Sequence, residues 1–262
     1  MLLARFAPVK SNRYKVLSEK AKKLEEVINW LSPKLFAIWT IFVAGMSVGK
    51  AQLDRYYFWD WTQWLFGITG LLVITIILNI LGKKSVIVNL NSDDYFKNNS
   101  IYHILLPIIL FYLGYVIMAG FQHLFAVTIY IIVYYALYII HTIQIDDKKN
   151  AIEPDSKKYI KTLFALILLF VAVVLGFIND DPLISTASVV TIPFLVVLLF
   201  GQHVRHLERA KFYPIFIFVM FVCSREAWFI IPIYLLFLLL RSYNYLRHQK
   251  VYPTFGVSDD SN

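Results

Sequence analysis

The residues best suited to chemistry in this chain gather in one short polar segment, residues 202–211. It carries histidines and arginines at helical spacing: His203, Arg205, His206 and Arg209. If the segment is helical, His203 and His206 approach one face together with Lys211, because residues three and four apart are neighbours on a helix. Two histidines with a carboxylate suit a transition metal, whereas arginines hold phosphate or diphosphate through paired hydrogen bonds. The segment therefore indicates an anion site or a metal site, and the simplest alternative is a basic loop that meets anionic lipid.

The signatures of well-known membrane enzymes are missing from the sequence. It has no HxxxH and HxxHH set of a diiron desaturase, no HExxH zinc motif, no DxxDG run and no Walker-type or GxGxxG loop. His103 and His141 are the two histidines expected at equal depth for haem ligation, but a histidine that caps a helix end is the simpler interpretation. No motif decides whether the chain is catalytic.

The composition is that of a membrane protein. Of the 262 residues, 59% are hydrophobic and 16% are charged, whereas a soluble domain has about 45–50% apolar and about 25% charged residues. The charged residues come in blocks between long apolar stretches, which predicts an all-α, polytopic bundle of transmembrane helices. Cys223 is the one cysteine, so no disulfide can form within the chain.

Eight apolar runs are candidates for membrane spans, since roughly 20 apolar residues cross a bilayer. They lie at about 35–49, 61–82, 101–119, 123–143, 160–178, 183–201, 212–224 and 227–241. The last two are short and share the polar turn Ser224-Arg225-Glu226, so they form either two short spans or one re-entrant hairpin. We expect two spans, because eight spans agree with the charges.

Eight spans divide the basic residues unequally between the two sides of the membrane. Of the 25 Lys and Arg residues, 22 fall on one side, and only Lys50, Arg55 and Arg225 fall on the other. Short loops rich in Lys and Arg stay in the cytoplasm, which places both termini inside and the protein in the cytoplasmic membrane of a bacterium or an archaeon. The net charge of +8 is then a consequence of topology, and a nucleic-acid partner is not expected.

The chain is expected to divide into three parts. Residues 1–33 form a cytoplasmic amphipathic arm, residues 34–243 the transmembrane bundle, and residues 244–262 a cytoplasmic tail. In the arm, Leu17, Leu24, Ile28 and Leu31 recur at helical spacing, with lysines and glutamates on the other face. This pattern predicts a helix on the membrane surface over 16–31.

The topology and one asparagine resemble the UbiA-type intramembrane prenyltransferases. Span two ends in Ile77-Leu78-Asn79, and Asn91-Ser92-Asp93 follows; in the family, the first Asp-rich motif follows an asparagine at the end of that span. The resemblance implies a helical bundle that holds a prenyl diphosphate through Mg²⁺ on Asp-rich loops after spans two and six.

This chain departs from the family at the aspartates. Ile80, Lys83 and Ile87 stand at the positions of the first motif, and the loop after span six has Glu208 but no pair of aspartates. Mg²⁺ binding is therefore doubtful, and we expect cations to bind the lipid anion directly. The predicted head-group site consists of Asn79, Lys83, Lys84, His203, Arg205, His206 and Arg209.

Three functions remain open at this point. The first is a protein that handles an isoprenoid or another lipid with an anionic head group, in a cavity open to the cytoplasmic leaflet; as an enzyme it would transfer a prenyl or lipid group. The second is a non-enzymatic subunit of a larger membrane complex, because 17 Tyr and 21 Phe residues suit contacts to pigments, quinones or partner proteins. The third is a transporter, although spans three to six contain almost no charges for a proton relay.

Overall fold

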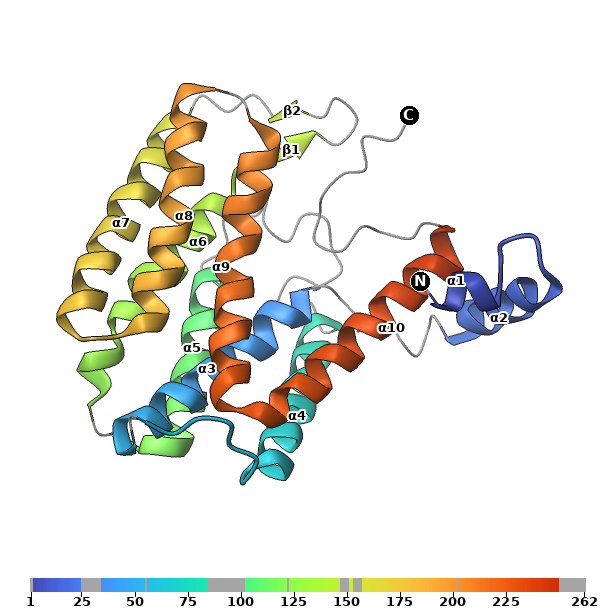
Figure 1. Ribbon diagram of the computed structural model, residues 1–262, viewed down its shortest axis with the longest axis horizontal. Helices are drawn as coiled ribbons and strands as arrows, with labels where there is room; N and C mark the ends of the chain where they lie inside the picture. The colour runs from blue at the N-terminus through green and yellow to red at the C-terminus, as the bar shows by residue number, and fades with distance from the viewer. Residues whose placement is uncertain are drawn as a thin grey trace. The chain divides into compact units, whose positions relative to one another are not determined.

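The computed structural model describes residues 2–24, 34–54, 56–83, 102–121, 123–146, 151–152, 157–201 and 203–249. In this part of the chain the fold is helical apart from one short hairpin (Figure 1). The α-helices are α1 (Leu2–Phe6), α2 (Asn12–Leu24), α3 (Lys34–Leu53), α4 (Trp64–Lys83), α5 (Tyr102–Ala119), α6 (Ile129–His141), α7 (Lys158–Ile178), α8 (Pro182–Phe200), α9 (Val204–Arg225) and α10 (Ile230–His248). Two 3-10 turns, Leu124–Val127 and Ala227–Phe229, precede α6 and α10.

Each apolar run of the sequence overlaps one of these helices. Helices α3, α4, α7 and α8 and the segment Ala227–Arg247 are long and apolar enough to cross a membrane, and α5 and α6 are shorter apolar helices. A helix satisfies all its backbone hydrogen bonds internally, which hydrocarbon requires. The chain is therefore a helical integral membrane protein, with five candidate spans among the residues that the structure describes. Eight spans with both termini in the cytoplasm stay a prediction.

Two segments expected to be loops have regular structure. Most of 202–211 belongs to α9, which runs without a break for 22 residues, about 33 Å at 1.5 Å per residue. The segment between the apolar runs 123–143 and 160–178 contains an antiparallel hairpin of β1 (Ile145–Asp146) and β2 (Ala151–Ile152), in which Ile145 pairs with Ile152. In 202–211 the charges interrupt the apolar pattern, yet Arg, Glu and Lys are good helix formers, so the helix includes them.

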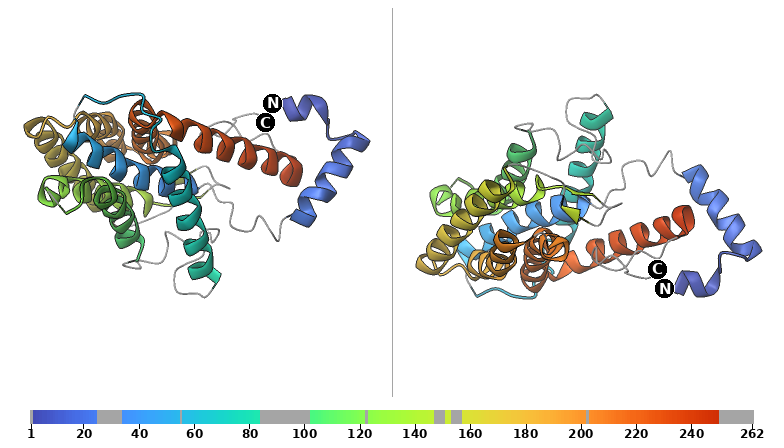
Figure 2. Two further views of the ribbon diagram at one scale, coloured as in Figure 1. Left: turned by 90° about the horizontal axis from the view of Figure 1, so that it is seen from below. Right: turned by 90° about the horizontal axis from the view of Figure 1, so that it is seen from above.

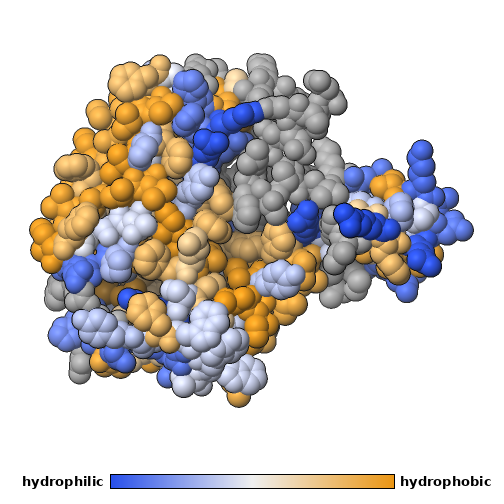
Figure 3. Space-filling view, viewed as in Figure 1, coloured by the Kyte–Doolittle hydropathy of each residue, from blue (hydrophilic) through white to orange (hydrophobic). Residues whose placement is uncertain are grey.

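Contacts divide the chain into two compact units. Unit 1 consists of residues 1–37, 63–95 and 228–262, and unit 2 of residues 38–62 and 96–227. In unit 2, α6, α7, α8 and α9 pack in sequence order, and both views in Figure 2 show α7, α8 and α9 side by side. Hydrophobic side chains cover the outward side of α7 and α8 (orange in Figure 3), as expected of helices that face lipid.

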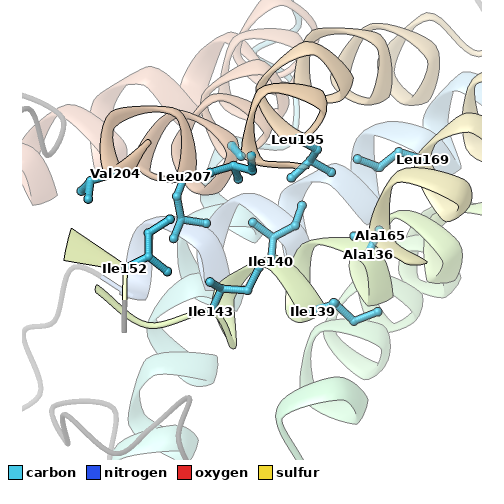
Figure 4. Packing of buried hydrophobic residues seen from close by; sticks show 12 residues of the cluster. Ala136, Ile139, Ile140, Ile143, Ile152, Ala165, Leu169, Leu195, Val204 and Leu207 are labelled. Atoms are coloured by element: carbon cyan, nitrogen blue, oxygen red, sulfur yellow. The ribbon is translucent and has the colours of Figure 1, made fainter. Parts of the chain in front are cut away.

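The core of unit 2 lies between α6, α7, α8 and α9. Ile140, Leu169, Leu195 and Leu207 point into it from the four helices, and Ile152 of the hairpin closes one end (Figure 4). Small residues let the helices approach: Ala136, Ala165, Ala172 and Gly176 are all buried. This is the usual packing of membrane helices, where close backbone contact replaces the hydrophobic effect.

Helices α3 and α5 come into close contact at glycine residues. Gly45 and Gly49 form a GxxxG pair on α3, and a Cβ on Gly49 would lie 2.8 Å from the carbonyl oxygen of Tyr115. From the other helix, a Cβ on Gly114 would overlap the carbonyl of Phe42. The two backbones therefore touch, and a larger residue at any of these glycines would push them apart.

Unit 1 joins the N-terminal arm to the end of α10. Ala7 and Tyr14 are buried against Tyr245, with Leu17 and Leu246 packed around them. The helical prediction for the arm is confirmed over 16–24, and residues 25–31 lie outside the described residues.

Candidate functional site

The predicted chemistry lies at the start of α9, and we call His203, Arg205, His206 and Arg209 the basic end of this helix. His203 is the N-cap residue, with an extended backbone. Its ring centroid lies 5.4 Å from that of His206, so the two histidines come together as expected. Arg205 and Arg209 are exposed one turn apart, with the spacing that two arginines need to bind one phosphate-sized anion from adjacent turns.

His206 has an environment that disfavours its charged form. Burial, His203 and Arg209 all lower the pKa of His206, so it is neutral at pH 7. Its Nδ1 atom is buried and has no hydrogen-bond partner in the part of the chain that the structure describes. The guanidinium groups of Arg205 and Arg209 are the permanent positive charges of the basic end, and the His206 imidazole can donate or accept a hydrogen bond.

Two lysines at this end of unit 2 stabilise helix ends. The Lys211 ammonium donates to the carbonyl of Ile143, just after α6, over 2.6 Å. The Lys158 ammonium donates to the carbonyl of Gly201, just after α8, over 3.1 Å. Cations near helix C-termini satisfy free carbonyls and oppose the helix dipole. Lys211, which the sequence placed beside the histidines, thus has a structural role.

The remaining predicted residues lie in unit 1. Asn79 is half-buried on α4, and Lys83 is the last residue of that helix. The Lys83 side chain and the whole of Lys84 lie outside the described part of the chain. A site shared between these residues and the basic end of α9 therefore stays a prediction.

A second polar site lies at the other end of α9 and was not predicted. Lys50 Nζ lies 2.8 Å from Asp60 Oδ2 and 2.9 Å from Glu226, and the side chain of Glu226 is fully buried. The Tyr57 hydroxyl lies 2.9 Å from the Ser47 carbonyl and 3.4 Å from Glu226 Oε1. We call Lys50, Tyr57, Asp60 and Glu226 the Lys50 cluster.

Backbone pairing holds the Lys50 cluster together. The Asp60 N–H donates to the Arg225 carbonyl over 2.7 Å, and the Ala227 N–H donates to the Asp60 carbonyl over 3.1 Å. Trp59, with a φ of 58°, donates to the Ser224 carbonyl over 2.9 Å. These hydrogen bonds hold the connection after α3 against the turn after α9.

The electrostatics of this cluster favour paired charges. Burial opposes ionisation of Asp60, but hydrogen bonds from Lys50 and Thr62 hold its pKa below the usual range. Burial and the Glu226 carboxylate raise the pKa of Tyr57, which therefore stays neutral. The Arg225 guanidinium lies 5.8 Å from the centre of the Tyr57 ring, a cation–π distance.

The sequence contained one signal for this cluster. Lys50 and Arg225 are two of the three basic residues outside the basic side of the predicted topology, and Glu226 stands in the turn that interrupts the last two apolar runs. A few cations and an acid on the same predicted side of the membrane indicate an ion pair.

The metal alternative gains no support from the residues that can be placed. Among them, no three His, Cys, Asp or Glu side chains come together. No protein-family model, curated protein or solved structure was found to match the chain. The structure thus shows a helical integral membrane protein with a polar cluster at each end of α9.

Proposed function

We propose that this protein binds the anionic head group of a membrane lipid at the basic end of α9, on the cytoplasmic side. The observation that carries the proposal is the exposed pair Arg205 and Arg209 beside His203 and the half-buried His206. The first N–H groups of a helix have no acceptor within it, and the helix dipole favours an anion there. Guanidinium groups, neutral imidazole and backbone N–H groups together suit a phosphate or diphosphate.

The surroundings of the basic end favour an amphiphilic ligand. The first turns of α7 lie at the same end of unit 2, as the contact between Lys158 and Gly201 shows, and they add Lys157 and Lys161. Tyr159, Ile160 and Phe200 expose apolar side chains there, Phe200 to 86%. An apolar tail can lie along such side chains while the head group meets the cations.

An isoprenoid phosphate is the ligand that the resemblance to UbiA-type prenyltransferases suggests. The Asp-rich motifs of that family are absent from the sequence, so direct contacts from arginine replace contacts through a metal. The proposal therefore concerns binding, and transfer chemistry would need further residues.

Thermal unfolding of the purified protein in detergent tests the proposal. Farnesyl diphosphate and dodecyl phosphate should raise the melting temperature, while dodecyl maltoside, which has a neutral head group, should not. The double variant Arg205→Gln with Arg209→Gln should abolish the rise and leave the melting temperature without ligand unchanged. Glu208→Gln is the matched control, because it alters the same helix without removing a cation, and it should keep the rise.

The same experiment distinguishes lipid binding from the alternative function, a subunit of a larger membrane complex. If neither lipid phosphate stabilises the parent protein, the head-group site does not exist. Co-purification of a partner protein in stoichiometric amount would then favour a subunit of a membrane complex.

A further inference from the structure

The N-terminal arm, α1 and α2, is fastened to the last turn of α10. The Tyr14 hydroxyl lies 3.0 Å from the carbonyl oxygen of Leu246 and 3.2 Å from that of Tyr245. Ser18 Oγ donates to Leu246 over 3.0 Å, and the Tyr245 hydroxyl donates to the carbonyl of Ala7 over 2.7 Å. The bonds to Leu246 satisfy a carbonyl that a helix C-terminus leaves free.

The position of these bonds determines where the arm lies. The apolar run of α10 ends at Leu240, and Arg241 begins its polar last turns, so Tyr245 and Leu246 lie just beyond the apolar part of this candidate span. A segment bonded to their carbonyls is held at the boundary between membrane and water. We therefore expect the arm to lie beside lipid head groups, whichever side of the membrane it occupies.

One face of α2 is used for this docking. Tyr14, Leu17, Ser18 and Ala21 follow the i, i+3, i+4, i+7 pattern of a single helix face, and Tyr14 and Ala21 are buried. Leu17, which the sequence placed against lipid, packs instead against the cluster of Ala7, Tyr14 and Tyr245.

The far side of α2 carries a different stripe. Arg13, Val16, Lys20 and Lys23 are separated by three, four and three residues, and all are exposed. Val16 is 52% exposed, and Phe6 of α1, under the Arg13 guanidinium, is 62% exposed. Figure 3 shows blue side chains around a small orange patch on the arm.

Basic side chains dominate the charge of α1 and α2. Among residues 2–24, Glu19 is the sole acid, and every other charged side chain is a lysine or an arginine. Exposed apolar side chains framed by cations are the signature of a helix that lies in the membrane interface. Each basic residue near an anionic surface contributes about 1 kcal/mol of attraction.

We infer that the stripe of Arg13, Val16, Lys20 and Lys23 binds the anionic leaflet next to the end of α10. Val16 and Phe6 enter the interface, and the lysines meet lipid phosphates. This surface is separate from the basic end of α9: it responds to the charge of the leaflet, whereas the α9 site selects an individual head group.

A fluorescent label on the full-length chain tests this inference. Val16→Cys in a Cys223→Ser background provides one labelling position on the stripe, and Lys15→Cys provides a matched position on the flank of the same helix. Each labelled protein is reconstituted in phosphatidylcholine vesicles, with or without phosphatidylglycerol, that contain a doxyl-lipid quencher.

Quenching at position 16 should increase severalfold when phosphatidylglycerol is present and should exceed quenching at position 15. It should fall with added salt, which screens exposed charges, and in the variant Lys20→Glu with Lys23→Glu. Equal quenching in neutral and anionic vesicles, or equal quenching at the two positions, would overturn the inference. Unchanged thermal unfolding of the charge-reversal variant in detergent shows that the fold is intact.

Discussion

The two ends of α9 hold charge in different ways. At the Lys50 cluster, Glu226 is fully buried and two carboxylates face one ammonium at 2.8 and 2.9 Å. At the basic end, Arg205, Arg209 and His203 are exposed. Burial of an unpaired charge is costly, so a buried carboxylate needs its cation. Exposed guanidinium groups carry no such requirement, because water solvates them.

We expect the Lys50 cluster to stabilise the fold and the basic end to bind a ligand. Removal of one member of the Lys50 cluster should destabilise the fold, whereas removal of the arginines at the basic end should affect ligand binding alone. The helix-capping lysines Lys158 and Lys211 fall between these extremes, because each donates to a backbone carbonyl.

Lys50→Met should cause the largest change. It leaves Glu226 buried without its cation, and breaking one partner of a buried pair costs about 3–5 kcal/mol. Denaturant unfolding in detergent, followed by circular dichroism, measures the loss in free energy of unfolding. The exposed Lys15→Met on α2 is the matched control and should stay within about 0.5 kcal/mol of the parent.

Replacement of both buried partners sharpens the same comparison. Lys50→Met combined with Glu226→Leu should recover most of the lost free energy, because apolar pairs often replace buried ion pairs without loss. A Lys50→Met protein as stable as the parent would contradict the structural role of the cluster.

The gain in stability from a bound ligand should depend on the basic end of α9 and not on the Lys50 cluster. At a concentration 100 times its dissociation constant, dodecyl phosphate should add about 2.7 kcal/mol to the free energy of unfolding. Arg205→Gln with Arg209→Gln should remove this gain, whereas Arg225→Gln, at the other end of α9, should keep it. Loss of the gain in Arg225→Gln alone would place the ligand at the wrong end for our proposal.

Lys211→Met should have a smaller effect on the fold. It leaves the Ile143 carbonyl without the ammonium that lies 2.6 Å away, and an unsatisfied buried polar group costs about 1–3 kcal/mol. Lys211→Arg, which keeps a charged donor, should lose less than half as much in the same unfolding experiment. A loss as large as that of Lys50→Met would mean that Lys211 also neutralises a buried charge.

The smallest expected effect is the loss of stability that protonation of Asp60 causes at low pH. The pKa of Asp60 is held below its usual range, which is about 3.9. Its contribution to stability is therefore complete above that value and is lost as the pH falls through the folded pKa. Between pH 5 and pH 3, Asp60→Asn should lose less stability than the parent; equal slopes would show that Asp60 does not titrate with unfolding.

Much of the fold could be predicted from local patterns. All eight apolar runs overlap helices, because a chain in hydrocarbon must satisfy its backbone within each segment. The start of α9 lies outside the apolar runs, because Arg205, Glu208, Arg209 and Lys211 interrupt the apolar pattern. Helix formation depends on backbone bonding and propensity as well as on hydrophobicity, so this polar segment continues the helix.

The partners of polar side chains could not be predicted in this way. Lys50 and Glu226 are 176 residues apart, and Tyr14 bonds to the backbone 231 residues away. Which donor meets which acceptor depends on how helices pack, and many packings satisfy the same apolar runs. His203 and His206 are the exception, because their closeness follows from helical spacing alone.

The sequence by itself determined the membrane class, the approximate helix boundaries and the type of residue at the basic end of α9. These properties depend on composition and on spacing within one helix, where the geometry is known in advance. Only the tertiary structure decided that Lys50 neutralises Glu226, that Lys211 caps α6, and that the Leu17 face of the arm docks on α10. Such choices follow from contacts between segments far apart in the chain, and the physical reason is common to all three: a buried carboxylate, a free carbonyl or an apolar face is satisfied by whichever group the packing brings within reach.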